Sequence, residues 1–230
     1  MEHYVRAKPC SIPFAVFKHS ADEHLHSSGE PQNYMFREMR AALDIPKTVD
    51  ILDHIYALPT AEAQEEAHEK IRAIERRAMV VQQPQAGLLP LMDYLQSRGM
   101  QKALLTRNFN APVQHLLGKF LVGYKFEPVI TRDFRPPKPH PAGILHIAKS
   151  WGLEDGGSRL IMVGDSIDDM TAGHEAGAAT VLLANDANAH LAEHQHTDLV
   201  ISRLDELIEI LEGGFVGNGN SEETKPGEQV

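Results

Sequence analysis

Hydrophobic and polar positions follow two different patterns along this chain. Between residues 33 and 80, apolar residues such as Met35, Met39 and Leu43 recur at helical spacing, which predicts helices throughout. After Pro84, short apolar runs alternate with segments of helical period. The predicted strands are 102–106, 129–130, 159–163, 179–183 and 198–201, and the predicted helices are 87–98, 111–121, 141–152, 167–176, 187–194 and 203–212. This alternation predicts βαβ units and a parallel sheet.

An earlier apolar run, residues 11–17, predicts the first strand of that sheet, and a polar loop follows it. The expected architecture is an α/β fold: a Rossmann-like parallel sheet core with a small helical cap inserted after the first strand. The expected divisions are a core of residues 11–30 and 84–212, a cap of residues 31–83, and a disordered tail of residues 213–230. The tail is rich in Gly, Glu and Asn and has little to bury.

Helix ends are marked by hydroxyl residues and glycines. Thr60 and Ser202 precede predicted helices and are expected N-caps, because their side-chain oxygens can accept hydrogen bonds from the first-turn N–H groups. Gly213 and Gly214 are expected to end the last helix.

Composition narrows the class of protein. The chain has 230 residues, of which 42% are hydrophobic and 23% charged, as in ordinary globular proteins. Its net charge of −10 argues against nucleic acid or an anionic membrane as a partner. The single cysteine, Cys10, fits a reducing compartment. With no signal peptide or membrane-spanning run in view, we expect a cytoplasmic protein that is a monomer or a weak homo-oligomer.

Acidic residues follow one of the predicted strands directly. The strand at 159–163 is followed by Gly164 and Asp165, and Asp169 falls in the first turn of the next helix. In open α/β sheets, ligands bind at the carboxyl ends of the strands. Two carboxylates placed there suit Mg²⁺. The alternative interpretation is a helix N-cap followed by an acidic first turn, which the positive end of a helix favours on its own.

Three ordered segments resemble motifs of the haloacid dehalogenase superfamily, whose members are mostly Mg²⁺-dependent phosphatases. The segment Gly164-Asp165-Ser166-x-x-Asp169 resembles the fourth motif. Leu104-Leu105-Thr106-Arg107-Asn108 resembles the second motif, and the proline-rich segment around Lys138 resembles the third. The resemblance extends from about Pro31 to Leu211 and is to members of the phosphoglycolate phosphatase type.

The resemblance implies a role for each of these residues. Asp165 would bind Mg²⁺, and Asp169 would bind it directly or through water. Lys138 would bridge the phosphate and a carboxylate. The phosphate would also be held by the Thr106 hydroxyl and by the backbone N–H groups of the next two residues, Arg107 and Asn108. The substrate would be a small phosphorylated metabolite, cleaved as a phosphate monoester.

Each of these residues also has a purely structural interpretation. Thr106 fits an ordinary strand end, and Lys138 fits a solvated loop lysine. Arg107 fits a partner for a carboxylate of the cap. The order of the motifs along the chain favours the functional interpretation.

The first motif of the family, Asp-x-Asp-Gly-Thr after the first strand, is missing. Lys18 stands where the nucleophilic aspartate would stand, and Ser20 stands where the second aspartate would. One explanation is a faulty or alternative transcript that breaks after Phe17. Another is an inactive protein that keeps the fold and binds a phosphate ligand. The third is a displaced nucleophile at Asp22. We expect weak or no phosphatase activity from the chain as written.

Two further hypotheses have less support. A response-regulator-like receiver shares the parallel sheet and an Asp/Lys site, but the chain length, the helical insert and the order of Lys138 and Asp165 argue against it. Two histidine clusters are metal candidates, and one pair is spaced i, i+4 on a predicted helix. Because no Cys or acidic partner completes either cluster, solvated positions are favoured for His19, His24, His26, His190, His194 and His196.

Overall fold

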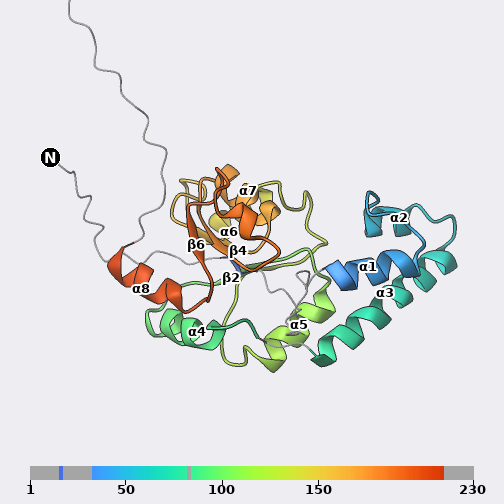
Figure 1. Cartoon of the computed structure of the whole chain (residues 1–230), viewed down its shortest axis with the longest axis horizontal. Coiled ribbons are helices and arrows are strands. Elements are labelled where there is room, and N and C mark those ends of the chain that lie inside the picture. The colour runs from blue at the N-terminus through green and yellow to red at the C-terminus, as the bar shows by residue number, and fades with distance from the viewer. Residues whose placement is uncertain (1–15, 18–32, 82–83, 215–230) are drawn as a thin grey trace, which may run out of the picture.

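The computed structural model describes residues 16–17, 33–81 and 84–214 (Figure 1). The predicted loop 18–30, most of the predicted tail and the first part of the predicted strand 11–17 lie outside this range. The described elements are, in chain order, β1 (Val16–Phe17), α1 (Asn33–Ala42), α2 (Ile51–Tyr56), α3 (Ala61–Val81), α4 (Leu88–Ser97), β2 (Ala103–Leu105), α5 (Asn110–Lys119), β3 (Val129–Ile130), α6 (Ala142–Ser150), β4 (Ile161–Gly164), α7 (Ile167–Glu175), β5 (Ala179–Leu183), the 3-10 helix η1 (Ala189–Leu191), β6 (Leu199–Ile201) and α8 (Glu206–Gly213).

The described strands form one sheet in the order β3-β2-β1-β4-β5-β6, and every neighbouring pair is parallel. The predicted Rossmann-like α/β core is therefore confirmed. The strand order reverses at β1, which pairs with β2 on one side and β4 on the other. Ligands bind at such a switch point, at the carboxyl ends of the strands.

Alternating side chains of the strands face the two helical layers that cover the sheet. In β2, Leu104 packs into a cluster with α4, α5 and α8, whereas Ala103 and Leu105 pack with α6 and α7 on the other face. Figure 1 shows α4 and α8 on one side of the sheet and α6 and α7 on the other. Because both faces are buried, the strands read as continuous apolar runs.

The described elements between β1 and α4 are all helices, joined by turns. Helices α1, α2 and α3 lie together at one end of the molecule, next to α5 (Figure 1). They enclose an apolar cluster of their own: Met39, Ile51, Leu52, Ile55, Ala67, Ile71 and Ile74. Thr60 Oγ1 accepts a hydrogen bond from Ala63 N at 3.1 Å, as expected for the cap of α3. Phe109 of the core packs against this cluster.

The predicted helix 187–194 is wrong, since only η1 forms there. Asn185 and Asn188 each accept a hydrogen bond from the other's backbone N–H, at 3.1 and 2.6 Å. Such local side-chain bonds compete with a helix for the same N–H groups. His190 and His194 therefore do not share a helix face. No group of three or more His, Cys, Asp or Glu side chains within the described ranges is placed to hold a metal ion.

Ser202 was expected to cap the last helix, but it does not. Helix α8 begins four residues later, at Glu206, with Asp205 at the N-cap position. Ser202 instead donates its hydroxyl to Glu206 Oε1 at 2.6 Å and its backbone N–H to Glu206 Oε2 at 3.3 Å. The predicted end of the helix at Gly213-Gly214 is confirmed. None of the described helices is long and apolar enough to cross a membrane.

Candidate active site

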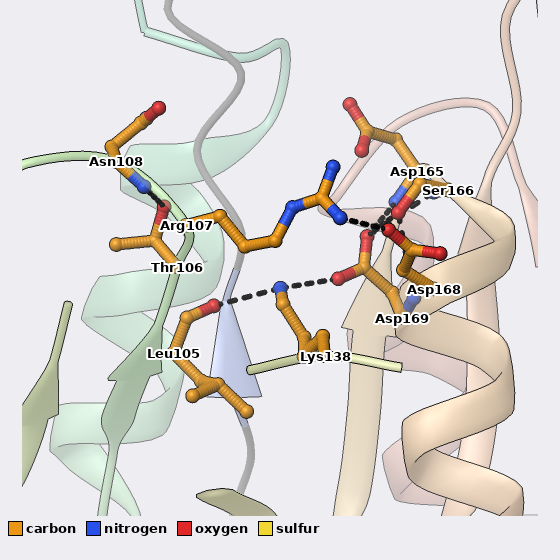
Figure 2. Close-up of polar contacts among 9 residues, drawn as sticks. All are labelled: Leu105, Thr106, Arg107, Asn108, Lys138, Asp165, Ser166, Asp168 and Asp169. Atoms are coloured by element: carbon orange, nitrogen blue, oxygen red, sulfur yellow. Dashed lines mark hydrogen bonds and ion pairs between the residues drawn. The ribbon is translucent and has the colours of Figure 1, made fainter. Parts of the chain in front are cut away.

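Lys138 is buried at the carboxyl edge of the sheet, in the loop between β3 and α6. Its side chain is 2% exposed, and Nζ donates a hydrogen bond to the carbonyl of Leu105 at 3.0 Å and forms an ion pair with Asp169 Oδ1 (Figure 2). Asp169 is fully buried. The interpretation of Lys138 as a solvated loop lysine is therefore wrong, and the residues of the second, third and fourth motifs meet in one place.

Asp169 also fixes the turn from β4 into α7. Its Oδ2 accepts hydrogen bonds from Asp165 N at 3.2 Å, Ser166 N at 3.1 Å and Ser166 Oγ at 2.6 Å. Ser166 is the N-cap, and together with Asp169 it forms a capping box. Ser166 and Asp169 therefore do form the helix cap of the alternative interpretation. Asp169 forms the ion pair with Lys138 at the same time. Asp165 precedes the cap at the strand end.

Two residues around Asp165 hold its backbone in place. At Gly164 a Cβ atom would lie 2.4 Å from Asp169 Cβ, so only glycine allows this close approach of strand end and helix. Asn188 donates its side-chain amide to the carbonyls of Asp165 at 2.8 Å and Leu183 at 3.0 Å. Asn188 is not among the predicted site residues, because the predicted helix 187–194 includes it. Asn188 lies in the loop after β5, at the same edge of the sheet, and this position along the sequence could have indicated it.

The second motif forms a tight loop after β2. Thr106 is buried, its backbone N–H donates to Ile130 O at 2.9 Å, and its Oγ1 accepts from Asn108 N at 3.0 Å. Arg107 reaches from β2 to the start of α7, where Nη1 contacts Asp168 Oδ2 at 2.5 Å (Figure 2). The suggestion that Arg107 pairs with a cap carboxylate is therefore wrong, because Asp168 belongs to the core.

The carboxylates at this edge fit Mg²⁺ chemically. Mg²⁺ sites commonly use one or two carboxylates and complete the coordination shell with water and phosphate oxygens. Asp165 and Asp169 supply such oxygens at the end of β4. One oxygen of Asp169 contacts Lys138 and the other accepts the N–H and O–H donors of the turn. Lys138 and a Mg²⁺ ion held by the carboxylates would together offset the charge of a bound phosphate.

Glu75 is a buried acid on α3, at the junction of the cap and the core. It is 4% exposed, and burial raises its pKa to about 7, although the charges of Arg132 and Arg72 act in the opposite direction. Folding therefore favours the protonated form. Its contribution to stability is complete below the ordinary pKa of 4.5 and is lost as the pH rises through about 7.

Glu75→Gln should therefore stabilise the protein more at pH 8 than at pH 5. We expect its free energy of unfolding, relative to the unmodified chain, to rise over this range by on the order of 1–3 kcal/mol. Urea unfolding at several pH values measures this difference. Glu62→Gln, an exposed position on the same helix, is the matched control. A difference for Glu75→Gln that does not change with pH would contradict the raised pKa.

The protein is an α/β protein, and the pair of Lys138 and Asp169 is buried at the carboxyl edge of its parallel sheet, near the switch point of the strand order. A family model for haloacid dehalogenase-like hydrolases matches residues 11–177, and the chain belongs to this family. The match includes the segment after β1 in which the Asp-x-Asp motif is missing.

Individual proteins support this membership. An uncharacterized hydrolase of Saccharomyces cerevisiae is 42% identical over 195 residues, which cover 84% of this chain and 87% of the yeast protein. A phosphoglycolate phosphatase of Haemophilus influenzae is 30% identical over 122 residues, about half of each chain at 52% and 54%. The crystal structure of a predicted phosphoglycolate phosphatase from Haemophilus somnus has the same fold, with a TM-score of 0.63 and 16% identity, covering 88% of this chain and 98% of that one.

Proposed function

We propose that this site is that of a Mg²⁺-dependent phosphatase acting on a small phosphate monoester. The observation that carries the proposal is the buried pair of Lys138 and Asp169, which stands next to Asp165 and Thr106 at the switch point of the sheet. The relatives named phosphoglycolate phosphatases support the phosphatase activity. Their similarity covers only about half of each chain, so we carry over the type of reaction and the small size of the substrate.

In this proposal each residue has a separate role in binding the phosphate dianion. Lys138 offsets the charge of the phosphate as a point charge, while Asp169 keeps the lysine in position. The Thr106 hydroxyl and the backbone N–H groups after it bind phosphate oxygens. Asp165 and Asp169 would hold Mg²⁺, which supplies Lewis-acid stabilisation of the phosphoryl oxygens when bound.

The sequence after β1 limits turnover in this proposal. Phosphatases of this family use an aspartate nucleophile, and the sequence continues from Phe17 with Lys18 and Ser20, which lie outside the described residues. A lysine at the nucleophile position is an ammonium at neutral pH, which has no lone pair with which to accept the phosphoryl group as the aspartate does. An inactive binding protein and a misjoined transcript remain alternatives, but no feature of the described residues favours either over a hydrolase.

Hydrolysis of small phosphate monoesters at neutral pH with Mg²⁺ tests this assignment. We expect the chain as written to show weak or no turnover, and Asp165→Asn to remove any turnover that is present. Robust turnover that Asp165→Asn abolishes would contradict the proposed limitation. If Asp22→Asn then abolished it as well, Asp22 would be the candidate nucleophile.

A further inference from the structure

A hollow lies at the amino edge of the sheet, where β2 and β3 begin. Its volume of about 700 Å³ falls within the range of about 300–1,000 Å³ that small-molecule sites occupy. Its walls are the loop from α4 to β2, the loop from α5 to β3 and the end of α6. The residues assigned above to phosphate and Mg²⁺ follow the carboxyl ends of the strands, at the opposite edge. The hollow is therefore separate from the candidate active site.

Lys102 lines this hollow and is a buried cation. The residue is 6% exposed, and its Nζ donates a hydrogen bond to the carbonyl of Met100 at 3.3 Å. It forms no ion pair with any residue of the described ranges, and burial lowers the pKa of the ammonium without a carboxylate acting in the opposite direction. An ammonium has three N–H groups to satisfy. Burying it with one long hydrogen bond is costly unless another group supplies acceptors.

The remaining charges at the hollow favour a ligand with a single negative group. Lys125 and Glu127, the other charged residues of its lining, form an exposed ion pair with each other at 2.5 Å. Helices α4 and α6 end beside the hollow, and the carboxyl end of a helix carries a partial negative charge. The full charge of Lys102 outweighs these partial charges for one carboxylate at hydrogen-bond distance. A dianion would gain no second cation and would meet more repulsion.

Trp151 and Met100 give the hollow two apolar wall residues. Trp151 packs partly against the apolar cluster on one face of the sheet, and Met100 packs against the cluster on the other face. The indole Nε1 donates to the carbonyl of Glu127 at 2.7 Å, which fixes the ring at the end of α6. A fixed indole offers a stacking surface to a planar ring, and a thioether also makes favourable contacts with aromatic rings.

We propose that this hollow is a binding site for a small aromatic carboxylate. The carboxylate accepts hydrogen bonds from Lys102 Nζ, and the ring lies against Trp151. None of the residues assigned to phosphate or Mg²⁺ lines the hollow, so this site does not depend on the proposed phosphatase activity. The carboxylate supplies the counter-charge that Lys102 lacks, and the aromatic ring removes apolar surface of the hollow from water.

Calorimetric titration with naphthalene-2-carboxylate, naphthalene-2-carboxamide and acetate at neutral pH tests this site. The amide keeps the ring and removes the charge, whereas acetate keeps the charge and removes the ring. We expect the aromatic carboxylate to bind at least about tenfold more tightly than either of the others, because only this ligand makes both contacts. In Lys102→Met the ratio of the amide and carboxylate dissociation constants should fall to about one. Lys125→Met, on the exposed rim of the hollow, is the matched control and should leave the ratio unchanged.

Trp151 locates the bound ring, because it is the only tryptophan of the chain. Protein labelled with 5-fluorotryptophan gives one fluorine NMR signal, which should shift during titration with naphthalene-2-carboxylate and report the calorimetric dissociation constant. A ratio measured on one variant does not depend on the fraction of folded protein. Equal binding of carboxylate and amide, a preference that survives in Lys102→Met, or binding that leaves the fluorine signal unmoved would overturn the proposed site.

Discussion

Lys138→Met should lower the free energy of unfolding by about 3–5 kcal/mol, the effect of removing one partner of a buried ion pair. The substitution leaves the carboxylate of Asp169 fully buried without the lysine, and the carbonyl of Leu105 loses a donor. Methionine fills a similar volume, so the loss reports the charge and the hydrogen bonds. Chemical denaturation of both proteins at neutral pH measures it.

An exposed lysine supplies the control for this substitution. Lys70 pairs with Glu66 at 2.9 Å on the surface of α3, and Lys70→Met should change stability by less than about 1 kcal/mol. If Lys138→Met were equally mild, the buried pair would not be an important part of this edge, and the account of the site would be wrong.

Replacing Lys18 and Ser20 together by aspartate should raise Mg²⁺-dependent turnover of a small phosphate monoester by at least about a hundredfold, since loss of one member of a catalytic unit removes most of its rate. The two substitutions restore the carboxylates of the family's first motif in the sequence after β1. They also remove a positive charge that would oppose Mg²⁺ at short range. Steady-state kinetics with and without Mg²⁺ measure the gain.

Asp165→Asn added to this double variant is the matched control and should remove the gained activity. Gain that survives Asp165→Asn would come from a contaminant or from another site. If the double variant gained nothing although it folded as well as the parent chain, the missing motif would not be what limits turnover.

The fold followed from the sequence because its strands are buried on both faces and its helices are regular. The run 179–183 is the strand β5 to the residue, and the glycines at 213 and 214 end α8. Predictions failed where side chains compete for backbone groups. The mutual hydrogen bonds of Asn185 and Asn188 replace a predicted helix, and Ser202 bonds to Glu206 instead of capping α8.

Some residues of the site could be predicted from the local sequence, and others are recognised only in the folded structure. Asp165, Asp169 and Lys138 follow from the strand ends and the motif order, and the structure brings Lys138 against Asp169. Asn188 could not be found from local patterns, because it acts through a loop whose conformation was wrongly predicted. Lys102, at the separate hollow, gains its surroundings only when the loops before β2 and β3 meet the end of α6.

We expect Lys138, Thr106, Asp165 and Asp169 to form a Mg²⁺-dependent phosphate site. Calorimetric titration with inorganic phosphate, first with Mg²⁺ and then with excess chelator, measures this directly, because binding does not require the missing nucleophile. We predict that phosphate binds when Mg²⁺ is present and that chelation of Mg²⁺ weakens phosphate binding at least about tenfold. Asp165→Asn should remove this dependence on Mg²⁺, because the metal would be coordinated by the carboxylate and by the phosphate together. Phosphate affinity that is the same with Mg²⁺, with chelator and in Asp165→Asn would contradict the account.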